Sequence, residues 1–378
     1  MSLKIGSLFC GGGVGESRLN ELGCKTIVAN EIREDRCNFF QSIHPNAEVL
    51  SGSITDTHIQ KKFIRIAKEN QLDVIMATPP CQGMSLVGRV SEDDPRNFLI
   101  YYAIKVIKSI LPRFVLLENV PRQLTTRIKV KNKKILIPDY ILQQLSRYYY
   151  FNPENLIKAM DYGIPQMRPR NIMLLTRRDE KKFWHFPPKK NHIVTLKEAI
   201  GHFPSLDPQL REGMAETLAM FPNFKRKAAR GKKFSSWHVP PVHPKKDVIA
   251  MQKTPTGKTA FDNEIFFPKR HDGHPMSGHS NHFRRMRWDK PSRTLTQNNG
   301  VMSSLACVHP GKTLRAGDES SRLYSDARSF SIKELFTIFS INFENKVDPN
   351  TSEVFLRRIA GEGIPPLLVK ELFNSIVR

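Results

Sequence analysis

The chain has 378 residues, of which 39% are hydrophobic and 25% are charged, a composition typical of folded globular proteins and not of disordered ones. Lysine and arginine number 59 against 36 acidic residues, so the formal net charge is +23. This excess favours a polyanionic partner, with nucleic acid the first choice and an anionic membrane surface the alternative. No apolar stretch is long enough for a membrane span, and we expect neither a span nor a signal peptide.

Short apolar runs alternate with amphipathic stretches through the first half of the chain. The runs predict strands at residues 3–9, 26–30, 49–54, 74–77, 114–117 and 171–176. The stretches between them predict helices at 15–22, 34–43, 59–69, 98–110 and 139–148. Such alternation is typical of an α/β fold with a doubly wound, mostly parallel sheet of Rossmann-like topology.

The character of the sequence changes near residue 184. Prolines and histidines become frequent, basic clusters appear, and helical periodicity is weak until a helix predicted at 332–339. We therefore expect a second, smaller, loop-rich and basic domain over residues 184–351. Residues 1–183 and 352–378 would form the first domain, which ends in a helix predicted at 367–377.

The cysteines and histidines fit neither a disulfide framework nor a zinc site. The five cysteines are an odd number without a C-x-x-C pair, which indicates a reducing compartment; they are Cys10, Cys24, Cys37, Cys81 and Cys307. A histidine group lacks the tight pairs of zinc ligands; it comprises His271, His274, His279 and His282. We therefore predict no metal site.

The first two predicted strands end in features of a ligand site. The segment FCGGGVGE follows the first strand, and its glycines let the backbone approach a ligand at a helix start. Glu16 takes the third glycine position of a dinucleotide fingerprint, so an oxidoreductase is disfavoured and F-x-G-x-G suits an adenosyl amino acid better. Glu31 can accept two ribose hydroxyls and Ile32 can cover an adenine face. A plain glycine turn and an exposed glutamate are the alternatives.

The next two strands end in Cys81 and Glu118. Pro79 and Pro80 place Cys81 on a stiff turn, as a nucleophile or as a small residue that fills a gap. Glu118 in a dry pocket can be protonated and bond a ring nitrogen, or it can pair with Arg122 at the surface.

A further segment, QMRPR, has donors at alternate positions. In an extended chain Gln166, Arg168 and Arg170 would point the same way. Together they can clamp a carbonyl, a phosphate or the Glu118 carboxylate, or they can be solvated on an edge strand.

Taken in order, these segments resemble the cytosine-C5 DNA methyltransferases of bacterial restriction-modification or orphan type. The resemblance continues through KPSRTLT at residues 290–296 and GEGIPP at residues 361–366, so it covers nearly the whole chain. It implies methyl transfer from S-adenosylmethionine to C5 of cytosine in a specific duplex DNA sequence, with S-adenosylhomocysteine as product. It also implies base flipping and a covalent adduct between Cys81 and cytosine C6.

The resemblance also implies residue roles. Cys81 would be the nucleophile, Glu118 would bond N3 and the exocyclic amine, Arg170 would hold O2, and Arg168 would brace the glutamate or the backbone. The implied cofactor residues are Phe9, Cys10, Gly11, Gly13, Val14, Glu31, Ile32, Ser53, Ile54, Pro80, Leu99, Glu362 and Ile364. The implied DNA contacts are Gln82, Ser85, Arg89, Arg96, Gln166, Arg285, Arg287, Arg293 and Thr294.

The sequence departs from the family pattern at three places. Ser53 stands where the family usually has Asp, which removes an expected contact to the adenine amine. Glu362 stands where the family usually has Asn, so a carboxylate would lie close to the cofactor. Lys333 and Glu334 replace the Arg-Glu of a later helix, and the Gly-Phe-Pro that follows it in the family is missing.

Two other functions stay open at this point. A transfer-RNA cytosine methyltransferase would use the same motifs, although the long variable region favours DNA readout. A catalytically inactive DNA-binding module is the other, disfavoured because Cys81, Glu118 and Arg170 are all present. We expect a cytoplasmic, nucleoid-associated monomer from a prokaryote or phage, with a cognate restriction endonuclease as a functional partner that is not physically bound.

Overall fold

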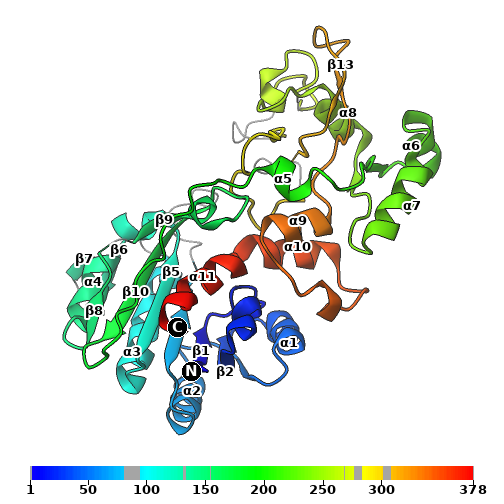
Figure 1. Cartoon of the computed structure of the whole chain (residues 1–378). Helices are drawn as coiled ribbons and strands as arrows, with labels where there is room; N and C mark the ends of the chain where they lie inside the picture. Colours follow the sequence, from blue (N-terminus) through cyan, green and yellow to red (C-terminus); the bar gives the residue numbers. More distant parts are fainter. Residues whose placement is uncertain are drawn as a thin grey trace.

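A computed structural model describes residues 2–80, 94–130, 133–153, 155–267, 269–275, 283–300 and 308–377. An eight-stranded sheet is its largest feature, with the order β3-β2-β1-β4-β5-β10-β8 and β9 beside β10 (Figure 1). The strands are β1 (Lys4–Leu8), β2 (Lys25–Glu31), β3 (Glu48–Ser51), β4 (Val74–Ala77), β5 (Phe114–Asn119), β8 (Tyr149–Phe151), β9 (Leu156–Lys158) and β10 (Pro169–Arg177). Strands β1 to β5 pair in parallel, which confirms the predicted α/β fold with a mostly parallel sheet.

From β1 the sheet extends to β2 and β3 on one side, and to β4 and β5 on the other. The strand order therefore reverses between β1 and β4. In open α/β sheets, ligands bind outside the carboxyl ends of the strands at such a reversal. At the far edge, β10 runs antiparallel to β5, β8 and β9, a direction that apolar runs alone do not reveal.

Side chains alternate between the two faces of the sheet because the strand period is two. In β4, Val74 and Met76 pack on one face, whereas Ile75 and Ala77 pack on the other. The helices and short 3-10 turns of this part are η1 (Gly15–Leu22), α1 (Glu34–Ile43), α2 (Thr57–Glu69), η2 (Pro95–Phe98), α3 (Leu99–Ile110), η3 (Pro121–Thr125), α4 (Ile137–Leu145) and η4 (Ala159–Tyr162). Helices α2, α3 and α4 cover the Ile75 face, and η1 covers the Val74 face.

The end of the chain returns to the sheet. Helix α10 (Glu353–Glu362) leads into α11 (Pro366–Val377), which packs beside η1 on the Val74 face. The buried indole Nε1 of Trp184 donates to the carbonyl of Leu372 at 2.9 Å and fixes α11 there. The first and last segments therefore share one hydrophobic cluster.

The middle of the chain contains more helix than the sequence predicts. Its elements are α5 (Leu196–Ile200), β11 (Gln209–Leu210), α6 (Met214–Met220), α7 (Phe224–Phe234), β12 (Val242–His243), α8 (Lys245–Lys253), η5 (Ala260–Asp262), β13 (Thr313–Arg315), β14 (Leu323–Tyr324), α9 (Ile332–Ile338) and η6 (Glu344–Lys346). Helical periodicity is weak in the sequence before Ser331, yet α5, α6, α7 and α8 form there; α7, for example, buries only Phe224 and Gly231 and so lacks an apolar stripe. A hairpin of β6 (Arg127–Val130) and β7 (Lys133–Leu136) was also missed.

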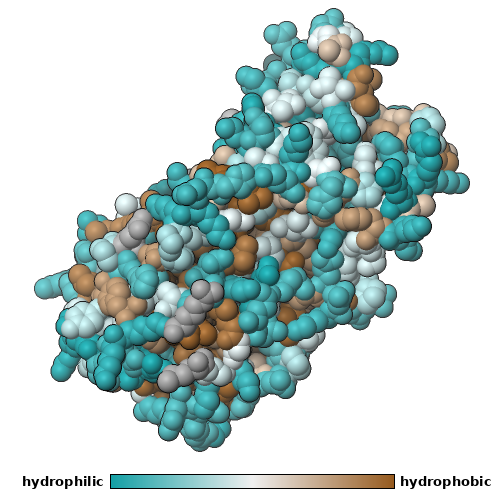
Figure 2. Space-filling view, in the orientation of Figure 1, coloured by the Kyte–Doolittle hydropathy of each residue, from teal (hydrophilic) through white to brown (hydrophobic). Residues whose placement is uncertain are grey.

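A second hydrophobic cluster fills this middle region. It gathers side chains of α5, α8, α9 and α10, and it also takes in Val14, Phe39 and Ile43 from the first part of the chain. The division at residues 184 and 351 therefore stays a prediction. On the face in Figure 2, hydrophobic side chains gather toward the middle of the molecule and hydrophilic ones cover much of the periphery.

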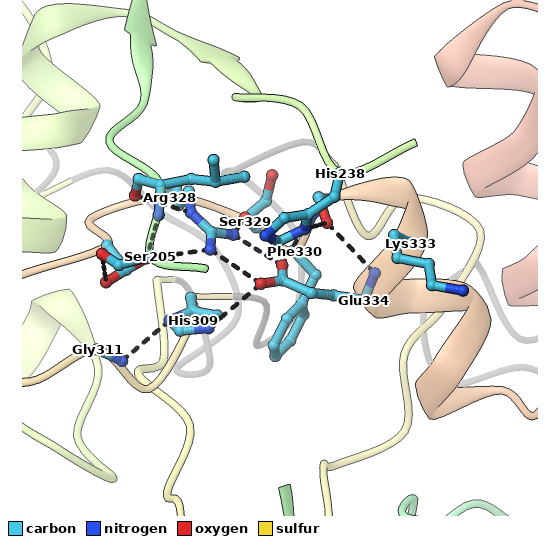
Figure 3. A network of polar contacts seen from close by, with 12 residues as sticks. Ser205, His238, His309, Gly311, Arg328, Ser329, Phe330, Lys333 and Glu334 are labelled. Carbon is cyan, nitrogen blue, oxygen red and sulfur yellow. Dashed lines mark hydrogen bonds and ion pairs between the residues drawn. The ribbon is translucent and has the colours of Figure 1, made fainter. Parts of the chain in front are cut away.

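A buried charge network anchors the start of α9 (Figure 3). Arg328 is fully enclosed and donates to both carboxylate oxygens of Glu334, at 2.7 and 2.9 Å, and to Asp326 at 3.1 Å. Glu334 also accepts from the backbone amide of Ser331 at 2.7 Å, and His309 lies 3.4 Å away. Burial alone would raise the pKa of Glu334, but the charge and hydrogen bonds of Arg328 together with the charges of His309 and His238 outweigh it and lower that pKa to about 2.

Candidate active site

The glycine loop after β1 follows a left-handed path. Phe9, Gly11 and Gly13 have φ of 58°, 53° and 72°. A Cβ on Gly13 would lie 2.7 Å from the ring of Phe40 and 2.9 Å from that of His44, so no larger residue fits. A Cβ on Gly11 would meet nothing within 4 Å, so this side of the loop faces open space. The loop is thus held tightly against α1 and open on its other side.

Glu31 holds the loop from the end of β2. Its carboxylate accepts from the backbone amide of Gly11 at 3.1 Å and from those of Ile32 and Arg33, both at 3.0 Å. Three of about four lone-pair positions are used, which leaves acceptor capacity for a hydroxyl. The neighbouring Ile32 is 66% exposed, an apolar side chain with no partner surface in the described chain.

The other expected cofactor residues differ in how exposed they are. Cys10, Val14, Ile54 and Ile364 are buried, Pro80 and Leu99 are half-buried, and the Ser53 hydroxyl lies 2.8 Å from that of Thr55. A Cβ on Gly363 would lie 2.7 Å from Val14, so the turn after α10 rests directly on the glycine loop.

Glu362, just before that turn, pairs with Arg36 of α1. Both carboxylate oxygens take part, one of them 3.0 Å from Nη2. Sequence reasoning singled out Glu362 as a carboxylate near the cofactor but did not find Arg36, because the partners lie 326 residues apart.

Glu118 and Arg170 form an ion pair at the ends of β5 and β10. Arg170 Nε lies 2.7 Å from Glu118 Oε1, and each side chain is 11% exposed. The antiparallel register, with Glu118 beside Ile172, brings the two together. Burial raises the pKa of Glu118, although the charges of Arg170 and Arg168 oppose the rise. The carboxyl is therefore closer to holding a proton at neutral pH than an ordinary glutamate.

Asn119 links this pair to the Pro-Pro turn. Its side-chain amide donates to the carbonyl of Pro79 at 3.0 Å, so the turn that leads into Cys81 is tied to the end of β5. Sequence reasoning missed this role, although the Glu-Asn-Val run marked the position. The expected site residues Cys81, Gln82, Ser85 and Arg89 lie outside the described residues, so their roles stay predictions.

Arg168 and Gln166 bind protein and not solvent. Arg168 is enclosed and donates to the carbonyls of Leu295, Gly361 and Gly363 at 3.0, 2.9 and 2.8 Å. Gln166 is fully buried, and its Oε1 accepts from the amide of Leu295 at 3.3 Å. The expected DNA contact of Gln166 is therefore wrong for this structure, because the side chain is enclosed among protein atoms.

The remaining expected DNA contacts divide by exposure. Arg293 is exposed, Thr294 is half-buried, and exposed Arg96 and Arg287 pair with acidic neighbours two residues away. Arg285 is instead fully buried, and its guanidinium donates to four backbone carbonyls, those of Thr254, His309, Pro310 and Met251. The expected DNA contact of Arg285 is wrong for the same reason, since no donor of this group reaches the surface.

The described part of the chain holds neither a metal cluster nor a membrane-spanning helix. No group of three histidine, cysteine or acidic side chains there is arranged to hold a metal ion. No helix among those residues is both long and apolar enough to cross a bilayer. His279, His282 and Cys307 lie outside them.

Comparison with known proteins places this fold among the methyltransferases. Solved structures that cover nearly the whole chain include the following two. One is a DNA modification methyltransferase encoded within an Escherichia coli prophage (TM-score 0.66, 19% identity, 99% of this chain and 98% of that one). The other is a mutant of DNMT2 from Spodoptera frugiperda (TM-score 0.59, 16% identity, 100% of both chains). At these identities they bear on the fold alone.

Sequence comparison gives the family. Residues 3–378 match the model of the C-5 cytosine-specific DNA methylases, and the chain belongs to this family. It is 35% identical to Type II methyltransferase M1.HgaI of Avibacterium volantium over 98% of both chains, and 30% identical to Type II methyltransferase M1.HphI of Haemophilus parahaemolyticus over 55% of this chain and 54% of that one. The predicted family is thereby confirmed, and the protein is a DNA cytosine-5 methyltransferase of restriction-modification type.

Proposed function

We propose that the protein transfers a methyl group to C5 of a flipped cytosine in a specific duplex DNA sequence, with S-adenosylmethionine as donor and S-adenosylhomocysteine as product. The observation that carries the proposal is the Glu118–Arg170 pair, which lies at the strand ends and is tied through Asn119 to the turn before Cys81. The open side of Gly11, the spare acceptor capacity of Glu31 and the exposed Ile32 fit an adenosyl ligand. The bound cofactor would supply an electrophilic methyl group.

The protein residues would make C5 nucleophilic. The Cys81 thiolate adds its electron pair to C6, and the ring electrons shift toward N3, where the raised pKa of Glu118 favours proton donation. Arg170 stabilises the charge at O2. C5 then takes the methyl group, loses its proton, and Cys81 leaves as the C5–C6 double bond forms again.

Recognition would fall to residues 184–351, with Arg293, Thr294 and Arg287 beside the duplex and Arg96 near the flipped base. Flipping costs a few kcal/mol, which contacts in the pocket offset.

Arg168 would act as a positioning residue, because it holds the 361–363 turn and the segment at Leu295 together. We place the protein in the cytoplasm as a monomer, with a restriction endonuclease acting separately on the same sequence.

The test is methyl transfer from labelled S-adenosylmethionine to duplex DNA and to transfer RNA, with wild type and Cys81→Ser. We expect 5-methylcytosine in DNA from wild type only, and bisulfite sequencing of the product gives the target site. Label in RNA alone would keep the mechanism and overturn the substrate. DNA binding without label in either polymer would indicate an inactive module.

A further inference from the structure

The Arg36–Glu362 ion pair joins two segments that the methyl-transfer chemistry does not require to meet. Arg36 lies in the first turn of α1, and Glu362 is the last residue of α10. The arginine side chain is 11% exposed and the glutamate 29%, so the pair is largely enclosed and Glu362 is the more accessible partner. An arginine and a carboxylate that meet through both carboxylate oxygens fix each other's orientation.

The surroundings of the pair are those of the candidate cofactor site. A Cβ on Gly12 would lie 2.6 Å from Ile359 and 3.1 Å from Phe39, so the glycine loop, α1 and α10 meet there. Gly363, the residue after Glu362, rests on Val14 of the same loop. The ion pair therefore lies between the loop and the two helices that border it.

The donors of Arg36 are only partly used. Both terminal nitrogens bind Glu362, whereas the buried Nε has no hydrogen-bond partner among the described residues. That nitrogen is enclosed, so a ligand acceptor can reach Arg36 only at the two terminal nitrogens, each of which carries two hydrogens. The Glu362 carboxylate in turn keeps lone pairs beyond those that bind Arg36.

An adenosyl amino acid ends in a zwitterion, with an ammonium group and a carboxylate on one carbon. The matching receptor is a carboxylate beside a guanidinium. A glutamate alone near this end would repel the ligand carboxylate, which is the problem that Glu362 poses where the family usually has Asn.

We propose that Arg36 and Glu362 act together as the receptor for the amino-acid end of the cofactor. Glu362 accepts from the ligand ammonium, while Arg36 neutralises Glu362 and attracts the ligand carboxylate. This inference rests on the proposed use of S-adenosylmethionine, and it makes Arg36 a specificity-determining residue for the ligand's charged end and not for its nucleoside.

The test compares two ligands that differ only at that end. S-adenosylhomocysteine carries the amino acid, whereas 5′-deoxy-5′-methylthioadenosine keeps the nucleoside and thioether without it. Isothermal titration would measure the Kd of both for wild type, Arg36→Ala and the near-isosteric Glu362→Gln. We expect each substitution to weaken S-adenosylhomocysteine by about tenfold or more and the methylthio compound by less than about twofold.

Ile32→Ala is the matched control, because Ile32 is expected at the nucleoside and its truncation should weaken both ligands alike. If Arg36→Ala and Glu362→Gln change both Kd values by the same factor, the pair is only a tie between helices and the proposal is overturned. Should Arg36→Ala fail to fold, Glu362→Gln decides by the same ratio. Wild type that binds neither ligand would instead overturn the proposed cofactor itself.

Discussion

Two buried glutamate–arginine pairs in this molecule have the same closest distance, 2.7 Å, and opposite pKa shifts of the carboxyl group. At the strand ends, the pKa of Glu118 is raised beside Arg170, whereas within the middle region that of Glu334 is lowered to about 2 beside Arg328. Burial acts on both carboxyl groups in the same direction. The partners make the difference. Arg328, with His309 and His238, lowers the pKa of Glu334 by more than burial raises it. At Glu118 the charges of Arg170 and Arg168 and one hydrogen-bonded ion pair lower the pKa by less than burial raises it.

The comparison distinguishes a pair that stabilises the fold, Arg328–Glu334, from a pair whose carboxyl group is available for chemistry, Arg170–Glu118. A carboxylate whose lone pairs are all used has no capacity for a substrate, and its charge is fixed over the working pH range. A carboxyl in a dry site with one arginine keeps both a free oxygen and access to its proton. The number of donors around a buried acid, more than its distance to an arginine, indicates whether it is available for chemistry.

The largest expected effect is on catalysis at Glu118. Glu118→Gln removes the proton donor and keeps the shape, so we expect kcat to fall by about 10²- to 10⁴-fold while the Kd for S-adenosylhomocysteine is unchanged. The raised pKa means that protonated Glu118 is lost as pH rises, so the decline of wild-type kcat at high pH should be absent from the variant. A kcat within about tenfold of wild type would remove Glu118 from the mechanism.

Glu334→Gln should give the opposite pattern. It leaves the enclosed Arg328 charge undercompensated, so we expect the free energy of unfolding to fall by about 3–5 kcal/mol. Urea unfolding measures this, and methyl transfer per folded molecule at low temperature should be preserved. If Glu118→Gln destabilises the fold as much as Glu334→Gln does, the distinction between the two pairs fails.

As the pH falls, the buried histidines should lower the free energy of unfolding before the carboxylates become protonated. Burial lowers the pKa of His243 to about 3 and those of His44 and His309 to about 4, below their ordinary value of 6.5. Below pH 6.5 the unfolded chain takes up protons that the folded chain does not, so each histidine costs about 1.4 kcal/mol of stability per pH unit. The contribution of Glu334 is present above pH 4.5 and is lost toward pH 2.

Urea unfolding at pH 7.5, 6.5 and 5.5 checks this. We expect little change over the first interval and a clear loss over the second. A stability that stays flat down to pH 5.5 would show that these histidines are not enclosed as neutral groups.

The smallest expected effect is on DNA binding, when the exposed Arg293 is replaced. Arg293→Ala should weaken DNA binding only severalfold and reduce the slope of log K against log salt by about one, because a phosphate contact contributes one released counterion. Binding measured between about 50 and 200 mM salt would show the change in slope. Arg285→Met is the contrasting change, since the loss of its enclosed guanidinium should affect unfolding and leave the salt slope unchanged.

Much of the fold follows from local sequence. The apolar runs place the parallel strands within a few residues, and the glycine loop, Glu31 and Glu118 fall at strand ends as expected. The local sequence pattern does not show the direction of a strand or which side chains pair across the sheet. The antiparallel course of β10 decides that Arg170 meets Glu118, and no periodicity within the strand reports it.

The two wrong DNA contacts share one physical cause. Arg285 and Gln166 were expected to contact DNA because the family resemblance implied it, and both are residue types that are usually exposed. In the structure, irregular segments present backbone carbonyls and amides that need partners, and these two side chains satisfy them. Arg36 was missed because its partner is remote in sequence. Contacts of this kind appear only when the whole chain is folded.

The return of α10 and α11 to the sheet has a consequence for the timing of activity in a growing cell. The carbonyls of Gly361 and Gly363 that Arg168 binds, and the carboxylate that Arg36 binds, belong to the part of the candidate site that is translated last. We expect a nascent chain stalled before residue 353 to hold no S-adenosylhomocysteine, and retention of the ligand by such a chain would contradict this. Modification would then begin only once this segment has been translated, so the time needed to reach it sets a minimum delay before newly made enzyme methylates DNA.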